Sequence, residues 1–390
     1  MRKLNPAQME CDKRILLIVV ILLAVGASLV ASSSSYFSTA KFSDPYFLLK
    51  RHLVRMLIAG LFLILAMHID YRIFRKLSPV ALTVGIAMLV GLLIFGHAIR
   101  DTMRWYHVRF LQVTFQPSEM ARLSLVLFLA YWVARKGESL QDFKSGFLPP
   151  AAAIVAVLGL MAAQPNYGSA SATAIIAFLM LYLGGVRIRH LTVLGLSVAG
   201  VALLRVISGG YVRERIVAYF NRSEGIGDMN WQLYQSLVGL GSGGPLGLGF
   251  GESRQKLNWL PDSHTDFIFS ILGEEAGLIG TLLVSLLFLL LVLRALKIST
   301  NSGDKFGQML VIGIGCSIFV YAMLNMSVAT GLFPVTGLPL PFLSYGGSAL
   351  VVNAFSVGIL LNVSKRTSLS NPSRRRRRPL RVYVKGERCV

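Results

Sequence analysis

The chain has 390 residues, of which 54% are hydrophobic, and its mean hydropathy of +0.63 excludes an ordinary soluble globular protein. Its formal net charge at pH 7 is +21, from 39 Lys and Arg residues against 18 Asp and Glu residues. The sequence contains no Walker-type phosphate loop and no Cys-x-x-Cys or His-rich spacing, so it supports neither ATP-driven transport nor a metal site.

Ten apolar runs predict membrane-spanning helices, because crossing the hydrocarbon core takes ~20 apolar residues. Backbone polar groups in lipid must be satisfied within the segment, so these runs are expected to be helical. The predicted fold is therefore an all-α polytopic membrane protein. The runs are residues 15–35, 53–69, 77–98, 120–134, 147–164, 171–186, 190–208, 266–293, 306–329 and 347–363.

The distribution of Lys and Arg predicts that both termini are cytoplasmic. With residues 1–14 inside, that side carries 25 of the 39 basic residues, in agreement with the positive-inside rule. We expect a cytoplasmic segment 1–14, a membrane domain 15–363 and a basic cytoplasmic tail 364–390. Five consecutive arginines at 374–378 favour contact with an anionic leaflet. Nucleic acid is the less favoured ligand for this tail, because no aromatic residues accompany the charge.

Residues 209–264 form the longest predicted outer loop, directly before the eighth run. A structureless loop of this length is unusual unless it has a function. Residues 230–240 (NWQLYQSLVGL) predict a short interfacial helix, and a glycine-rich run follows at 241–251 (GSGGPLGLGFG). Glycine allows tight turns and close backbone approach. The run is expected either to approach a ligand or to pack on the helices as a re-entrant loop, and the sequence leaves both open.

Residues 259–269 (WLPDSHTDFIF) bring ionisable side chains to the mouth of the eighth run. A carboxylate between water and hydrocarbon is costly unless it is used, so Asp266 is the main candidate for a functional residue. Its alternative role is a first-turn helix position, favoured by the helix dipole. For His264 a local hydrogen bond is favoured over metal ligation. Glu274 and Glu275, deeper in the run, are expected to face the bundle and to pair with hydroxyls, amides or a basic residue.

Two further groups of residues lie at the outer ends of the predicted helices. Basic residues there oppose the topological gradient and favour an anionic ligand such as a pyrophosphate, although snorkelling to lipid phosphates explains part of the set. Polar residues at several helix starts favour a shared cleft, although each alone is compatible with helix capping. The basic residues are Lys50, Arg51, Arg100, Arg104, Arg109, Arg122, Arg213 and Arg215, and the polar residues are Gln116, Ser118, Glu119, Gln164, Asn166, Ser344, Tyr345 and Ser348.

Eight motifs along the chain carry a resemblance to a known family. In these motifs the chain resembles the SEDS (shape, elongation, division and sporulation) family of bacterial membrane glycosyltransferases, the FtsW and RodA group. It resembles the division branch, FtsW, more closely than the elongation branch. The motifs are VASSSSYFSTAKFSDPYFLLKRHL at 30–53, HIDYRIFRKL at 68–77, RWYHVRFLQVTFQPSEMARLSLVLFLAYW at 104–132, QPNYGSASA at 164–172, RERIVAYF at 213–220, YQSLVGLGSGGPLGLGFGES at 234–253, LPDSHTDFIFSILGEEAGLIG at 260–280 and GLPLPFLSYGGSALVVNAFSVGILLN at 337–362.

The resemblance implies polymerisation of lipid II, an undecaprenyl-pyrophosphate-linked disaccharide-pentapeptide, on the outer face of the bacterial cytoplasmic membrane. It also implies a class B penicillin-binding protein as partner, within a division or elongation complex, and division implies the septum. A divalent cation, Mg²⁺ or Mn²⁺, is compatible with it, although no ligand cluster specifies one. Asp266 matches the family's required acidic residue, with His264 and Thr265 beside it as substrate-binding candidates. Two positions depart from the family: Asn166 replaces the aspartate of Gln-Pro-Asp-x-Gly, and Arg122 replaces a lysine.

An inverting transfer from a pyrophosphate-linked donor needs one general base and positive charge on the leaving group, rather than the two carboxylates of a glycosidase. We expect Asp266 to be the base, with Arg213, Arg215, Lys50 and Arg51 on the phosphates. A lipid II transporter or flippase would use the same outer cations, but it should also carry charges along a path through the membrane, where charges here thin out. A non-catalytic divisome scaffold is the third hypothesis.

Overall fold

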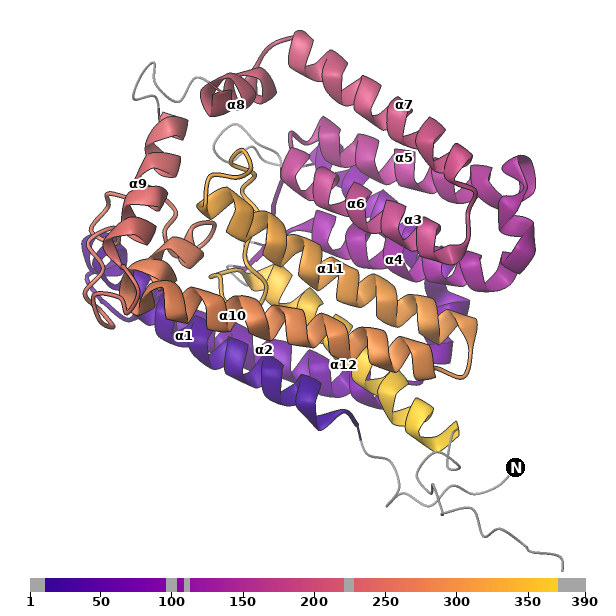
Figure 1. Ribbon diagram of the computed structural model, residues 1–390, viewed down its shortest axis with the longest axis horizontal. Coiled ribbons are helices and arrows are strands. Elements are labelled where there is room, and N and C mark those ends of the chain that lie inside the picture. Colours follow the sequence, from indigo (N-terminus) through magenta and orange to yellow (C-terminus); the bar gives the residue numbers. More distant parts are fainter. Residues whose placement is uncertain (1–10, 96–103, 109–112, 221–227, 371–390) are drawn as a thin grey trace, which may run out of the picture.

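The computed structural model describes residues 11–95, 104–108, 113–220 and 228–370. The predictions for Arg100, Arg109 and the arginine run at 374–378 lie outside these residues. Within them the fold is a bundle of α-helices (Figure 1). One small antiparallel sheet joins β1 (Tyr106–Val108) to β2 (Val113–Phe115), with Tyr106 opposite Phe115. The predicted helical membrane fold is confirmed.

In the described ranges, ten long helices coincide with the ten predicted apolar runs. Eight of these segments are long and apolar enough to cross a membrane, and α2 and α4 are not among the eight. The number of crossings, their orientation and the boundaries of the terminal segments therefore stay predictions. The helices are α1 (Lys13–Phe42), α2 (Phe47–His68), α3 (Tyr71–Phe95), α4 (Pro117–Lys136), α5 (Leu148–Ala163), α6 (Tyr167–Gly184), α7 (Ile188–Ile207), α10 (Ile268–Asn301), α11 (Lys305–Ala329) and α12 (Gly347–Ser370).

The centre of the bundle is formed by α4 and α11. Almost every residue of α4 from Pro117 to Ala130 is buried, and α11 packs on α10, α4 and α6. Around them α12 lies along α2, and α3 lies along α4. By contrast, α7 is apolar but largely exposed at the edge of the bundle (Figure 1), as expected of a helix that faces lipid. A 3-10 helix, η2 (Gly137–Gln141), and a π-helical turn, η3 (Phe143–Phe147), connect α4 to α5.

The predicted outer loop at 209–264 contains two helices, α8 (Tyr211–Phe220) and α9 (Asp228–Ser242). The helix predicted at 230–240 is confirmed as the main part of α9. The glycine-rich run packs on α10, because a Cβ atom on Gly243 would lie 2.0 Å from the carbonyl oxygen of Gly273, and one on Gly247 would lie 2.1 Å from that of Glu275. The packing expected of the re-entrant alternative is observed, because these glycines allow backbone to approach backbone, whereas approach to a ligand stays a prediction.

The helix α10 is interrupted where this loop docks. Gly277 has φ 66° and ψ −165°, a conformation that only glycine adopts without strain. The freed amide groups of Leu278 and Ile279 donate to the carbonyl oxygens of Gly244 and Pro245, at 2.9 and 3.2 Å. The loop thus replaces the helical hydrogen bonds that the break removes, as buried backbone requires.

Candidate functional site

The linker at 331–346, between α11 and α12, is where the outer ends of several helices meet. A Cβ atom on Gly337 would lie 3.4 Å from Oδ2 of Asp266, and one on Gly168 would lie 2.4 Å from the carbonyl oxygen of Thr336. Gly337 also has a φ of 71°, which favours glycine. The linker therefore contacts both the loop before α10 and the Gln-Pro-Asn-Tyr-Gly turn before α6.

Asp266 lies immediately before α10 and is half-buried. The helix starts at Ile268 with Phe267 as its N-cap residue, so the first-turn alternative for Asp266 is wrong. Its backbone is held from two sides. The Asp266 amide donates to the Asp262 carbonyl at 3.1 Å, and the Asp266 carbonyl accepts from the side-chain amide of Asn325 on α11 at 2.7 Å. The carboxylate thus projects from a backbone fixed to the centre of the bundle.

Ser344 and Tyr345 join the linker to the same loop. The Ser344 hydroxyl donates to the Thr265 carbonyl at 2.5 Å and accepts from the Leu340 amide at 2.8 Å. The capping alternative for Ser344 is therefore wrong, because the hydroxyl bridges two loops. The Tyr345 amide donates to the His264 carbonyl at 2.9 Å, and their ring centroids lie 5.7 Å apart. His264 is thus part of a local cluster of rings, and its predicted role as a hydrogen-bonding side chain stays a prediction.

The Tyr345 ring also contacts Arg55, which lines a groove between α2, β2, α4 and α12. The guanidinium of Arg55 lies 4.5 Å from the Tyr345 ring centroid, a cation–π contact. The groove has a volume of about 810 Å³, and its cations come from the first turns of α2, while later turns supply apolar side chains. Its lining residues are Lys50, Arg51, Val54, Arg55, Ile58, Phe62, Thr114, Phe115, Met120, Gly347, Ser348, Val351 and Val352.

Two of these cations were predicted from the sequence and the third was missed. Lys50 is largely exposed and pairs with Asp44 at 2.8 Å, and this hydrogen bond lowers the pKa of the Asp44 carboxyl below its ordinary value. Arg51 lies over the Phe47 ring at 4.7 Å. Arg55 follows Arg51 by one helical turn, so helical spacing was the signal that would have found it.

The polar residues at the start of α4 contact two other predicted segments. The Gln116 amide donates to the Ser348 hydroxyl at 3.0 Å, and the Asn166 side-chain amide donates to the Ser118 hydroxyl at 3.1 Å. The N-cap residue of α4 is Gln116, so the capping alternative for Ser118 is wrong. The expected convergence of these helix ends is confirmed, whereas their functional roles stay predictions.

Glu119 and Arg122 form a buried ion pair in the first turns of α4. Their side chains are 1% and 3% exposed, and the Arg122 guanidinium lies 2.6 Å from the Glu119 carboxylate. The same guanidinium donates to Asn353 of α12 at 3.0 Å and lies over the Tyr321 ring of α11 at 4.3 Å. Within the bundle, the Glu119 carboxylate is thus committed to a structural pair that ties three helices together.

The arginines of the outer loops differ in what they contact. Arg104 donates to the carbonyl oxygen of Pro165, and Arg215 donates to that of Val335 at 2.5 Å. The first bond fixes the loop before α4 to the turn that contains Asn166, and the second fixes α8 to the linker at 331–346. Arg213 is exposed. The structure therefore does not gather the outer-loop arginines with Lys50, Arg51 and Arg55 around one cavity. Within the described ranges, no group of three or more His, Cys, Asp and Glu side chains lies together to hold a metal ion.

Replacing Asn166 by Asp is expected to be tolerated. Asn166 is buried and donates to Ser118, and the Ser118 hydroxyl can rotate to donate to a carboxylate instead. We expect the Asn166→Asp protein to keep at least about half of the wild-type activity, because the bond between residues 166 and 118 has one donor and one acceptor in both the wild type and the variant. The measurement is the specific activity and the melting temperature of the purified protein. A folded but inactive variant would mean that the site requires the amide donor.

These features define the class of the protein: a polytopic helical membrane protein in which Tyr345 connects the loop that carries Asp266 to a cation-lined groove. The chain belongs to the family of FtsW, RodA and SpoVE, since a family model described as a cell cycle protein matches residues 13–369. The family resemblance found in the sequence is confirmed.

Similar curated proteins cover almost the whole chain. A probable peptidoglycan glycosyltransferase FtsW of Geobacter sulfurreducens is 39% identical over 367 residues, which are 93% of this chain and 98% of that protein. The stage V sporulation protein E of Bacillus subtilis is 36% identical, over 91% of this chain and 97% of that protein. A probable peptidoglycan glycosyltransferase FtsW of Escherichia coli O157:H7 is 31% identical, over 97% and 89%.

Two solved structures share the fold. The rod shape determining protein RodA of Thermus thermophilus superposes with a TM-score of 0.70 at 25% identity, over 93% of this chain and 99% of that one. A chain from a study entitled "Structural coordination of polymerization and crosslinking by a peptidoglycan synthase complex" has a TM-score of 0.76 at 24% identity, over 92% and 99%. The second likeness concerns the fold alone.

Proposed function

We propose that this protein is a peptidoglycan glycosyltransferase that polymerises lipid II at the outer face of the bacterial cytoplasmic membrane, for septal synthesis during division. The names of the curated FtsW relatives support the chemistry. The observation that carries the proposal is the position of Tyr345, whose ring contacts both His264, two residues before Asp266, and Arg55, which lines the groove. One aromatic residue therefore connects the loop that carries Asp266 to an amphipathic, cation-lined groove.

The groove matches the chemistry of a lipid-linked pyrophosphate. Guanidinium groups bind phosphate oxygens through parallel hydrogen bonds, so Arg51 and Arg55 are suited to the pyrophosphate, with Lys50 as a further cation. The apolar side chains Val54, Ile58 and Phe62 follow on the same face of α2, where a polyprenyl chain would lie. Burial of that chain and pairing of the charge would bind opposite ends of the same donor.

In the proposed reaction, the 4-hydroxyl oxygen of the acceptor sugar attacks C1 of the donor sugar. The bond between C1 and the pyrophosphate oxygen breaks, the configuration at C1 inverts, and the pyrophosphate leaves with the electron pair. Asp266 accepts the proton of the attacking hydroxyl. Positive charge from the groove stabilises the leaving group. His264, Thr265, Ser344 and Ser348 are proposed to shape the sugar site around this carboxylate.

The proposed glycosyl transfer includes no step on a divalent cation. Among the described residues, no group of three or more His, Cys, Asp and Glu side chains that includes Asp266 lies together as a ligand set. Mg²⁺ or Mn²⁺, when bound, would supply further positive charge to the leaving group. We propose a class B penicillin-binding protein as the partner that crosslinks the strands, within a division complex.

The experiment that tests the proposed function is polymerisation in liposomes. The purified full-length chain, with its class B penicillin-binding protein, is given fluorescent lipid II, and glycan strands are resolved by electrophoresis with and without a chelator. Strands are the expected product. Transfer of lipid II across the bilayer without strands would support a flippase, and partner binding without either activity would support a scaffold.

Neutralising the groove arginines is expected to weaken donor binding. Loss of one charge-assisted phosphate contact costs ~1.5–3 kcal/mol, which corresponds to roughly ten- to a hundredfold in affinity. We expect this loss for Arg55→Gln and a larger one for Arg51→Gln/Arg55→Gln, measured as the dissociation constant for lipid II. The matched control is Lys41→Gln, an exposed cation that lies over the Phe37 ring outside the groove. Equal losses for control and groove variants would contradict the assignment of the groove.

A further inference from the structure

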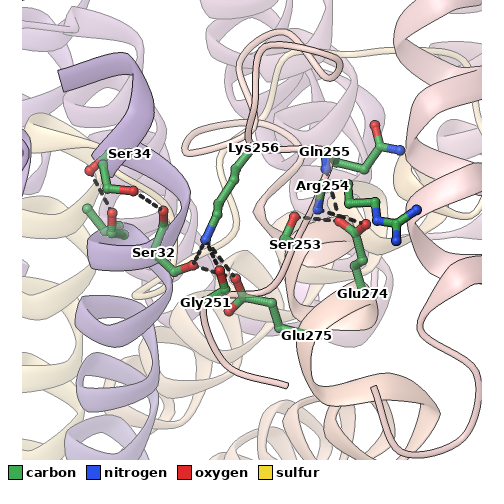
Figure 2. A network of polar contacts seen from close by, with 11 residues as sticks. Ser32, Ser34, Gly251, Ser253, Arg254, Gln255, Lys256, Glu274 and Glu275 are labelled. Atoms are coloured by element: carbon green, nitrogen blue, oxygen red, sulfur yellow. Dashed lines mark hydrogen bonds and ion pairs between the residues drawn. The ribbon is translucent and has the colours of Figure 1, made fainter. Parts of the chain in front are cut away.

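Two adjacent carboxylates, Glu274 and Glu275, lie at the break in α10 and are 1% and 4% exposed. Buried carboxylates in a membrane helix are costly unless their oxygens accept hydrogen bonds. Figure 2 shows that they point to different parts of the outer loop. As the sequence predicted, their partners are hydroxyls, amides and a basic residue. The mechanism proposed above uses neither of them.

Glu274 holds the loop through three consecutive residues. It accepts from the Ser253 hydroxyl and from the backbone amides of Arg254, at 3.1 Å, and Gln255, at 3.2 Å (Figure 2). A fourth, longer contact at 3.5 Å comes from the Ser242 hydroxyl at the end of α9. A carboxylate supplies acceptors only, so this site matches the three converging donors of residues 253–255.

Glu275 contacts α1 instead. It accepts from the Ser32 hydroxyl, and the ammonium group of Lys256 lies 3.9 Å from it (Figure 2). Lys256 also donates to Ser32 at 3.3 Å and to the Gly251 carbonyl. Lys256 directly follows the segment that Glu274 holds. The two glutamates therefore fix one stretch of loop between α1 and α10.

Two successive turns of the loop connect this stretch to Asp266. The Gln255 carbonyl accepts from the Leu260 amide at 3.1 Å, and Leu260 is 1% exposed in an apolar cluster with Phe267. Two residues further on, the Asp262 carbonyl accepts from the Asp266 amide at 3.1 Å. The first turn ends at Leu260 and the second begins two residues later at Asp262, so a shift of the chain at Gln255 would reach Asp266 through this short connection.

We propose that Glu274 is a positioning residue, which sets the place of the Asp266 carboxylate by holding residues 253–255. The inference rests on the proposed function in one respect: Asp266 is taken as the group that receives the proton. Glu274 lies inside α10. Among the described residues, the hydrogen-bond partners of its carboxylate belong to α9 and to residues 253–255, and none belongs to the groove or to the linker at 331–346. It acts through the backbone of the loop.

The first test measures hydrogen exchange and needs no activity. Glu274→Gln introduces an amide donor opposite the Arg254 and Gln255 amides, so those two bonds cannot both persist. We expect exchange to accelerate by roughly tenfold at residues 254 and 255 and also at the Leu260 and Asp266 amides. The matched control is Glu252→Gln, the same change at an exposed carboxylate of the same loop. Acceleration confined to 253–255 would overturn the proposal.

The second test separates positioning from binding. A displaced base lowers kcat but leaves donor binding intact, so Glu274→Gln is expected to lower kcat roughly tenfold or more with KM changed less than about twofold. The Glu252→Gln control should keep both values. A rise in KM with unchanged kcat would overturn the inference. If the wild type makes no strands, the proposed function fails while the exchange test still decides whether Glu274 orders the loop.

A milder variant covers the case in which Glu274→Gln does not fold. Ser253→Ala removes one donor and leaves the carboxylate with the two backbone amides. We expect a smaller change of the same pattern: faster exchange at Arg254, Gln255, Leu260 and Asp266, and a lower kcat at unchanged KM. A Ser253→Ala protein with wild-type exchange at Asp266 but a lower kcat would contradict transmission through the loop.

Discussion

Asp266→Asn is expected to abolish glycan synthesis in a protein that still folds and binds its partner. The side-chain amide has nearly the shape of the carboxylate, but it cannot accept a proton from the acceptor hydroxyl. A general base contributes ~10²–10⁴-fold to the rate, so the loss should reach that range. The backbone bonds that hold this residue, from Asn325 and to Asp262, do not involve the substituted group. The measurement is the rate of lipid II polymerisation at saturating substrate.

The matched control for this prediction is Asp262→Asn. It makes the same change of charge four residues away, at a position whose φ of 54° asparagine also tolerates. Its side chain is half-buried like that of Asp266. We expect this variant to retain most of the wild-type rate. Retention of more than about a tenth of the rate by Asp266→Asn would remove Asp266 from the role of base.

Arg122→Met is expected to produce the largest loss of stability among single substitutions at the outer ends of the helices. The substitution leaves the Glu119 carboxylate buried without its cation and removes the bond to Asn353. Breaking a buried pair in this way costs ~3–5 kcal/mol in the free energy of unfolding. The measurement is reversible unfolding in mixed micelles, at constant lipid composition.

Two further variants separate charge from packing at this position. Arg122→Lys keeps the charge, and lysine is the residue usual in the family. We therefore expect the free energy of unfolding to fall by only about 1 kcal/mol or less, because lysine contacts the Tyr321 ring with a different geometry. The double variant Glu119→Gln/Arg122→Met removes both charges and should be more stable than Arg122→Met alone. A double variant less stable than Arg122→Met would show that the pair is not the source of the effect.

The sequence by itself determined the helical membrane fold and the main candidate residue. Each apolar run became a helix near its predicted limits, because a segment in lipid has no other way to satisfy its backbone. Asp266 was recognised for a similar reason, since a carboxylate at the edge of the hydrocarbon requires an explanation. Burial of Glu274 and Glu275 against donors was predictable on the same physical grounds.

Only the tertiary structure decided what the short polar side chains contact. Ser118 and Ser344 sit near helix starts, where capping is a local solution, but each bonds to a segment that is distant in sequence. Arg55 belongs to the groove because Gly347, at the start of α12, and Tyr345, in the linker before it, lie against α2. The glycine-rich run packs on α10 because that helix is broken at Gly277. A hydroxyl or guanidinium has several partners of similar energy, so the choice depends on which segments the folded bundle brings within hydrogen-bonding distance.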